Sequence, residues 1–211
     1  LGSNILCERH NKALSPLDRT ALSVFRAVRR FDKNLKNAVA AQTSELIVTS
    51  GERMQLWLLK LAWGCLAADV LPGHERGAGA LRTPPLGSDL GEVLFRGARW
   101  PSGWGMYGLM MPGMRVSQMG HVQLEAKYGP DRALWSMAVE LGPIAFHLCL
   151  GVPGHPGWRA VHRPAGVVLK SDLADGQHVI ALSWRDGGGD PLFLTWEGEG
   201  VAGRSPSGSP R

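Results

Sequence analysis

The N-terminal third of the sequence shows a hydrophobic period of three to four residues, which predicts helices. Between residues 16 and 36 this period marks one side of an amphipathic helix of about five turns. Ser15 as N-cap, Pro16 at the first helical position and Asp18 near the positive helix end indicate its start. The apolar side is formed by Leu17, Ala21, Val24, Val28, Phe31 and Leu35. The other side carries Arg19, Arg26, Arg29, Arg30, Lys33 and Lys36.

A second helix is predicted at about residues 51–68, and it is apolar nearly all round. Such a helix is buried or packs on two sides. Cys65 lies on it and is interpreted as a core residue, because free Cys usually behaves as a small hydrophobe. Residues 45–49 precede it as a short apolar piece, for which a strand and a helical continuation both remain open.

The second half of the chain alternates apolar and polar residues, a period of two that is typical of half-buried strands. Turn residues separate these segments at hairpin spacing, which favours antiparallel pairing. We therefore predict an α+β fold: two N-terminal helices, one basic and amphipathic and one strongly apolar, followed by an antiparallel β-sheet of about five or six strands. The predicted strands are residues 121–128, 133–141, 144–150, 167–169, 179–184 and 192–196, after a short helix at about 88–95.

Glycine and proline divide the chain into parts. Residues 70–87 are rich in both and are predicted to be a linker or long loop. It separates an N-terminal part, 1–69, from a β-rich domain, 88–197. Residues 198–211 are rich in Gly, Ser and Pro and are predicted to be a disordered tail.

Charge is distributed unevenly along the chain. Residues 1–60 hold ten Lys and Arg against five Asp and Glu, whereas the remaining residues hold thirteen of each. The whole net charge of +5 thus comes from the N-terminal part, where a polyanion would bind. The sequence has no apolar run long enough to cross a membrane, so no membrane partner is expected. The three Cys are scattered and odd in number, which favours a reducing cytoplasm over a disulfide framework.

The first residues hold the one tight group of chemically versatile side chains, Asn4, Cys7 and His10. Cys7 and His10 have a C-x-x-H spacing, and a tight turn of that length lets two side chains converge on one ion. A structural zinc site needs four ligands, so these two make only half of one. The alternative is a half-buried Cys with a His that flanks the following helix.

The string N-I-L-C-E-R-H-N, followed by L-S-P-L-D and a long helix, resembles the second half of the motif of bacterial His-Asn-His (HNH, ββα-metal) endonucleases. The resemblance implies that Asn4 is the middle Asn, which orients the catalytic His, and that Cys7 and His10 are the second pair of structural zinc ligands. In such nucleases a His activates water and a divalent ion polarises the phosphate. The first half of the motif, with that His, has no counterpart in this sequence.

The expected function is therefore that of a truncated HNH-like protein, which binds Zn²⁺ and DNA but does not cleave it. A catalytic divalent metal would belong to the full-length nuclease. Cations on the amphipathic helix would contact phosphates and add affinity without sequence preference. The alternative for this helix is a solvated face on a core helix. The proposed phosphate-binding residues are Arg26, Arg29, Arg30, Lys33 and Lys36.

A second hypothesis makes the chain a non-enzymatic β-rich binding module, with Trp100, Trp104 and Tyr107 at the edge of its sheet. The alternative for residues 101–112, which the sequence favours, is a strand followed by a bend. The affinity of such a module would depend little on salt, whereas phosphate binding would weaken steeply with salt. A third and weaker hypothesis is an enzyme that uses His147 or Cys149, which stand two positions apart on one strand. No further ligand or carboxylate near them in the sequence supports it.

Overall fold

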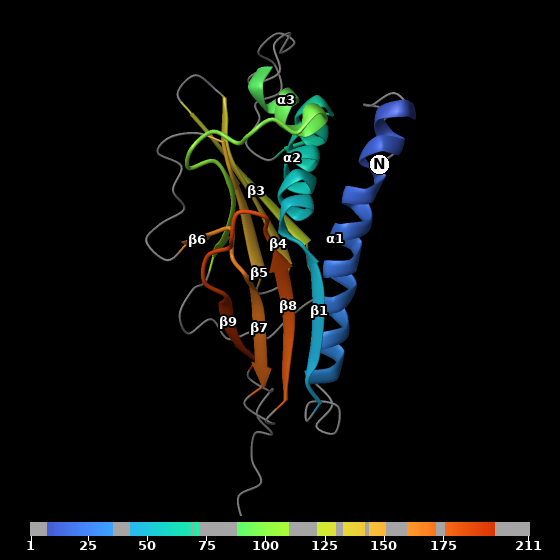
Figure 1. The fold of residues 1–211 in the computed structure, drawn as a ribbon, viewed down its shortest axis with the longest axis vertical. Helices are drawn as coiled ribbons and strands as arrows, with labels where there is room; N and C mark the ends of the chain where they lie inside the picture. The colour runs from blue at the N-terminus through green and yellow to red at the C-terminus, as the bar shows by residue number, and fades with distance from the viewer. Residues whose placement is uncertain are drawn as a thin grey trace, which may run out of the picture.

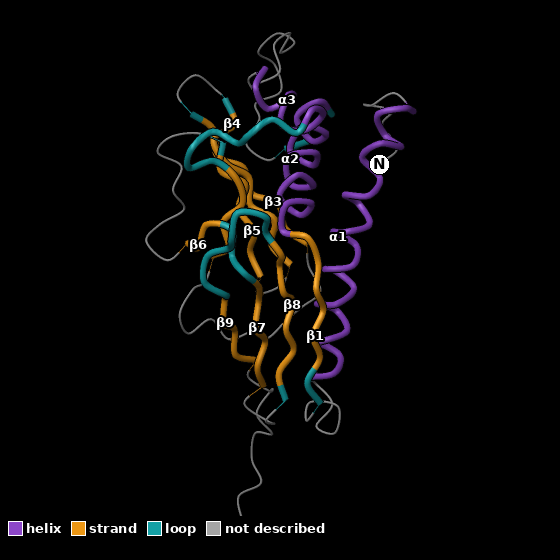
Figure 2. Tube along the Cα trace, viewed as in Figure 1, coloured by secondary structure: helices purple, strands orange, loops and turns teal. Residues whose placement is uncertain are grey.

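The α+β prediction is confirmed by the computed structural model, which describes residues 8–35, 43–68, 70–71, 88–109, 122–129, 133–141, 144–150, 160–171 and 176–196. Helices gather along one side of the strands (Figure 2). The helices are α1 (Glu8–Leu35), α2 (Gly51–Ala67) and α3 (Ser88–Arg96). The strands are β1 (Glu45–Ser50), β2 (Gly105–Leu109), β3 (Val122–Tyr128), β4 (Leu134–Leu141), β5 (Ile144–Cys149), β6 (Ala160–His162), β7 (Gly166–Ser171), β8 (Gln177–Ser183) and β9 (Leu192–Trp196).

These strands form two sheets rather than one. Sheet A has the order β1-β8-β7-β9 and is mixed, because β1 runs parallel to β8 and β9 runs parallel to β7. Sheet B has the order β3-β4-β5-β2-β6 and is antiparallel throughout. All six predicted strands are present, and residues 45–49, which the sequence left open, are the edge strand of sheet A.

Helix α1 begins at Glu8, so the predicted start at Ser15 and Pro16 is wrong. Pro16 lies inside the helix, where it cannot donate to the carbonyl four residues earlier. The apolar side explains why the helix nevertheless continues, because it extends back to the buried Leu14 and in the other direction through Leu17 to Phe31. The Thr20 hydroxyl donates to the Pro16 carbonyl at 3.1 Å within the following turn.

Helix α2 follows β1 directly and lies at the centre of the fold. Ser50 is its N-cap and accepts a hydrogen bond from the Arg53 N–H at 3.2 Å. The helix contacts α1, α3, β2, β5 and β8, as expected for a segment that is apolar nearly all round. Its buried Gln55 accepts a hydrogen bond from the Met106 N–H at 2.9 Å, which ties α2 to sheet B.

The pairing of β1 with β8 joins residues on both sides of the predicted 70–87 linker in one sheet. Helix α1 lies beside β1 along its length (Figure 1) and also contacts β8. Of the linker only Val70 and Leu71 are described, and the predicted tail at 198–211 lies outside the described residues. The predicted division into parts therefore stays a prediction.

Candidate nucleic-acid interface

The solvent-facing side of α1 carries a line of cations. Arg19, Arg26 and Lys33 recur every seven residues, a spacing that returns to the same side of a helix after two turns. Arg29 and Arg30 lie next to this line, and all five residues are exposed. We call these five residues the basic face of α1. It is opposite the apolar side, whose buried residues include Val24, Val28 and Phe31.

Most of this charge is uncompensated. Arg30 is paired, since its Nε donates to Glu45 Oε2 at 3.2 Å. Among the side chains that the structure describes, which do not include Asp32 of the same helix, no carboxylate lies within ion-pair distance of Arg19, Arg26, Arg29 or Lys33. Four cations on one helix side therefore remain available to an external anion.

A groove of about 440 Å³ lies between α1 and the edge strand β1. Its floor is partly apolar, with Leu22 and Ile47, and its rim is basic. Long cationic side chains around an apolar floor suit a partner that presents both charge and apolar surface. The basic residues of the rim are Arg19, Arg26 and Arg30.

His178 of β8 packs against the buried side of α1. The ring is fully buried and stacks on Phe31 with 4.4 Å between ring centroids. Its Nδ1 lies 3.6 Å from Glu45 Oε2, the same oxygen that Arg30 contacts. Burial lowers the pKa of His178, the charge of Arg30 lowers it further, and Glu45 opposes both. The imidazole beneath the basic face is therefore neutral, and Glu45 forms its ion pair with Arg30.

Most of the proposed metal-site residues lie outside the described part of the chain. Asn4, Cys7 and Lys36 lie outside the described residues, and His10 is described only as a helical residue. Glu8, Arg9 and His10 belong to the first turn of α1, so the expected turn from Cys7 to His10 stays a prediction. In the described part of the chain, no three His, Cys, Asp or Glu side chains lie together as a metal site requires. The zinc site stays a prediction.

The aromatic residues of the binding-module hypothesis do not form an exposed edge. Tyr107 is only 5% exposed, and its hydroxyl donates to the Gly103 carbonyl at 2.8 Å. Trp100 and Trp104 are half-buried and pack against the hydrophobic core. The interpretation of these three side chains as one exposed surface is therefore wrong for Tyr107.

His147 and Cys149 lie on the same face of β5, where both are buried. The register places Tyr107 of β2 opposite His147. Burial lowers the pKa of His147 to about 4 and raises the pKa of the Cys149 thiol to about 11. Both side chains are therefore neutral near pH 7, and a thiol that is not ionised is a poor nucleophile. The geometry does not favour the enzyme hypothesis.

Sequence reasoning missed one member of the basic face and the groove beside it. Arg19 was placed on the basic side of the helix but was not proposed as a phosphate ligand. Its seven-residue spacing from Arg26 was the available signal. The contribution of Ile47 had no such signal, because it depends on how β1 packs beside α1.

No protein-family model, curated protein or solved structure matches this chain. The HNH resemblance therefore rests on residues 4–18 alone. Among the described helices, none combines the length and the apolar character that a membrane span requires.

Proposed function

We propose that this chain is part of an HNH-like protein and binds DNA non-specifically through the basic face of α1. The observation that carries the proposal is the line of exposed cations without acidic partners among the described residues, Arg19, Arg26, Arg29 and Lys33. The charge distribution supports it, because the entire net positive charge of the chain lies within residues 1–60.

The dimensions of α1 suit a phosphate backbone. At 1.5 Å per residue, the helix from Arg19 to Lys33 is about 21 Å long. One strand of duplex DNA presents a phosphate about every 3.4 Å along its axis, so this length faces about six phosphates. Guanidinium groups pair well with phosphate oxygens because their donors form a planar fork. Such contacts carry no base preference, hence non-specific binding.

Cys7 and His10 would hold half of a zinc site beside this face. Their sulfur and nitrogen donors are ligands that Zn²⁺ prefers, and His10 lies in the first turn of α1 while Cys7 directly precedes it. Two donors do not complete a structural site, so the other two ligands would come from the missing half of the motif or from a second chain. Bound zinc would add positive charge and order the start of α1. No catalytic step is proposed, because this sequence offers no counterpart of the catalytic His.

The experiment is DNA binding as a function of salt, measured by fluorescence anisotropy with a short labelled duplex. If four cations contact phosphates, the logarithm of the association constant falls with the logarithm of salt concentration with a slope of about −3.6. Arg26→Gln/Arg29→Gln should reduce the slope to about −1.8 and weaken binding at every salt concentration. Arg96→Gln/Lys170→Gln removes the same charge from other exposed sites and should leave the slope unchanged. An equal effect of both pairs would show that net charge alone attracts DNA.

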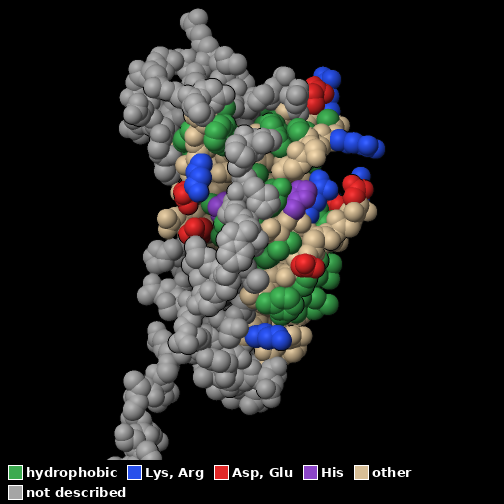
Figure 3. Space-filling view, turned by 90° about the vertical axis from the view of Figure 1, so that its left-hand side faces the viewer, with side chains coloured by type: hydrophobic (Ala, Val, Ile, Leu, Met, Phe, Trp, Pro, Cys, Tyr) green, Lys and Arg blue, Asp and Glu red, His purple; other side chains and the backbone are tan. Residues whose placement is uncertain are grey.

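One observation favours the second candidate, a β-rich module that binds another protein. The outer face of sheet A exposes a row of apolar side chains across its strands, with Leu46 and Val48 each 65% exposed and Phe193 55% exposed. Val179 and Val168 complete the row between Leu46 and Phe193. Hydrophobic side chains gather in the lower half of the molecule, where sheet A lies (Figure 3). Apolar patches of this kind mark interaction sites. Absence of DNA binding at low salt would favour this candidate.

A reducing compartment, the cytoplasm, is also part of the proposal. Cys65 and Cys149 are free and buried in the structure. Buried free thiols are typical of proteins that function where disulfides do not form.

A further inference from the structure

A second basic site lies away from the exposed side of α1, at the end of sheet A where β1 and β8 finish. The two strands are parallel, so both end at the same end of the sheet. Helix α2 starts there directly after β1, and Arg185 follows β8. In α/β structures ligands bind outside the carboxyl ends of parallel strands. The sequence indicated no site at this position.

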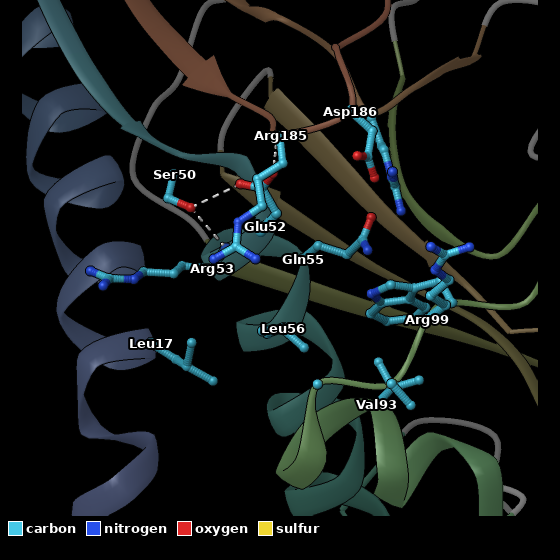
Figure 4. Close-up of a pocket in the computed structure, with 14 residues that line it drawn as sticks. Leu17, Ser50, Glu52, Arg53, Gln55, Leu56, Val93, Arg99, Arg185 and Asp186 are labelled. Carbon is cyan, nitrogen blue, oxygen red and sulfur yellow. Dashed lines mark hydrogen bonds between the residues drawn. The ribbon is translucent and has the colours of Figure 1, made fainter.

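An open groove of about 880 Å³ lies at this end of sheet A. Side chains from α1, the start of α2, the segment after α3 and the turn after β8 surround it (Figure 4). Arg99 and Asp186 lie on one side of the groove, Ser50 and Arg53 on the other, and Gln55 lies between them. We call it the arginine groove, after the four cations that line it: Arg53, Arg99, Arg163 and Arg185.

The groove carries an excess of positive charge. Two carboxylates, Glu52 and Asp186, face four guanidinium groups. Among the described residues, none of the four arginines has a carboxylate within ion-pair distance. Glu52 is held by other donors, because its carboxylate accepts hydrogen bonds from the Arg185 N–H and from the Ser50 hydroxyl. Burial would raise the pKa of Glu52, but its hydrogen bonds together with the positive charge of Arg185 outweigh burial and lower it.

Arg163 carries the strongest sign of a ligand. Its Nε is buried and has no hydrogen-bond partner within the described part of the chain. The guanidinium lies over the Trp184 ring at 5.6 Å, and the Trp184 indole N–H donates to the Pro164 carbonyl at 2.9 Å. A buried charged donor without an acceptor is rare in folded proteins. The Arg163 side chain also lines the groove, so an oxyanion there would compensate the charge of its guanidinium group.

The remaining wall of the groove is apolar. Leu17 comes from α1, Leu56 from α2 and Val93 from α3, and the half-buried Trp100 adds an aromatic surface. A volume in this range, with apolar side chains beside convergent polar groups, is typical of small-molecule sites. The ligand should therefore carry both an anionic group and an apolar or aromatic body.

We propose that the arginine groove binds a small phosphorylated ligand, whose phosphate oxygens accept hydrogen bonds from Arg163, Arg185 and Arg99 and whose body packs against Trp100. Arg53 contributes positive charge from the start of α2. This site is independent of the DNA-binding face, because the two share no basic residue.

The test is isothermal titration with two probes, AMP and inorganic pyrophosphate. We expect both to bind the wild-type chain, and the base of AMP should add affinity by packing against Trp100. Arg163→Gln/Arg185→Gln should weaken both by about tenfold or more, because two charge-assisted hydrogen bonds are lost. Arg26→Gln/Arg29→Gln on α1 is the matched control and should bind AMP as the wild type does. In the DNA assay, Arg163→Gln/Arg185→Gln should leave the salt slope unchanged, whereas Arg26→Gln/Arg29→Gln should reduce it.

Arg99→Gln is a second variant, chosen because Arg99 is exposed. It should weaken pyrophosphate binding while circular dichroism stays unchanged. No binding of either probe to the wild type, or equal binding by the wild type and all groove variants, would overturn the proposal. If the groove variants lose affinity for duplex DNA but AMP does not bind, the groove belongs to the nucleic-acid interface and the small-ligand proposal is wrong. Failure of the DNA proposal alone would leave AMP binding intact.

Discussion

At the scale of single residues, His178 makes stability depend on pH. The ring faces Glu45 of β1, Arg30 and Phe31 of α1 and the opposite residue Leu169 of β7. Neither ring nitrogen has a hydrogen-bond partner in the described part of the chain. The packed interior between α1 and sheet A therefore favours the neutral form of the ring over the charged one.

We predict that the free energy of unfolding falls as pH drops below about 6.5. The pKa of His178 is lowered in the folded state, so the unfolded chain takes up the proton first and is stabilised by it. Above the unfolded pKa both states are neutral and this effect is absent. His178→Phe keeps the stacking on Phe31 and removes the titration. It should raise stability by about 1 kcal/mol and flatten the pH dependence.

Urea unfolding at pH 8 and pH 5.5 would measure both effects. His147, whose pKa is lowered by burial to about 4, also lowers stability between about pH 6.5 and 4, so His178→Phe should reduce the pH dependence without abolishing it. An unchanged pH profile between pH 8 and 5.5 in His178→Phe would contradict the assignment.

The residues that matter most were those least visible in the sequence. Arg26, Arg29 and Lys33 could be predicted as exposed, because the helical period alone decides which side they face. Gly51 could not. A Cβ at this position would come within 2.2 Å of the Trp184 ring, so only glycine allows α2 to start against β8. Contacts between residues this far apart in the chain have no local signature, and the arginine groove depends on several of them.

At the scale of elements, α1 continues through a proline. The predicted start at Ser15 and Pro16 was reasonable, because both residues favour helix N-termini. The outcome was decided by packing, since Leu14 extends the buried side beyond Pro16. The helix therefore retains a residue that its backbone disfavours.

We predict that Pro16→Ala stabilises the protein by about 1–3 kcal/mol, because proline within a helix loses a hydrogen bond and strains the preceding turn. Ser15→Ala is the informative companion. It should change stability little, because Ser15 is an exposed residue within the helix. If the helix began at Pro16, the pattern would be reversed: Ser15→Ala would cost about 1 kcal/mol as a lost N-cap, and Pro16→Ala would be neutral. Chemical denaturation of both variants separates the two cases.

The strands show the same division between local and long-range causes. β3, β4 and β5 were predicted because their side chains alternate clearly. β2 has two glycines in five residues, so residues 101–112 indicated only a strand with a bend, and β6, with three residues, has no strand pattern of its own. Both are strands because β2 pairs with β5 on one side and with β6 on the other. Such strands depend on their partners rather than on propensity.

At the scale of the whole molecule, two links join the N-terminal helices to the β-rich part. β1 adds the edge strand of sheet A next to β8, and Gln55 of α2 accepts a hydrogen bond from the Met106 N–H of β2. Composition could not reveal either link, because the Gly- and Pro-rich segment at 70–87 reads as a boundary whether or not strands pair across it.

We predict that the full chain unfolds in one cooperative transition and that residues 88–211 alone do not fold stably. Without β1 and α2, the fragment would expose the inner side of sheet A at Ile180 and Leu182 and leave the Met106 N–H without its acceptor. Circular dichroism and calorimetry should give a single melting transition for the whole chain and no cooperative transition for the fragment.

A milder version of the same test uses Gln55→Leu in the full chain. The substitution keeps the side-chain size but leaves the buried Met106 N–H without a partner, which should cost about 1–3 kcal/mol. Leu56→Gln is a matched control at a half-buried neighbouring position. In a cooperative molecule, Gln55→Leu lowers the single melting temperature of helices and strands together. Two separate transitions, with only one of them shifted, would show that the parts before and after residues 70–87 fold independently, and the shared sheet would then contribute little to stability.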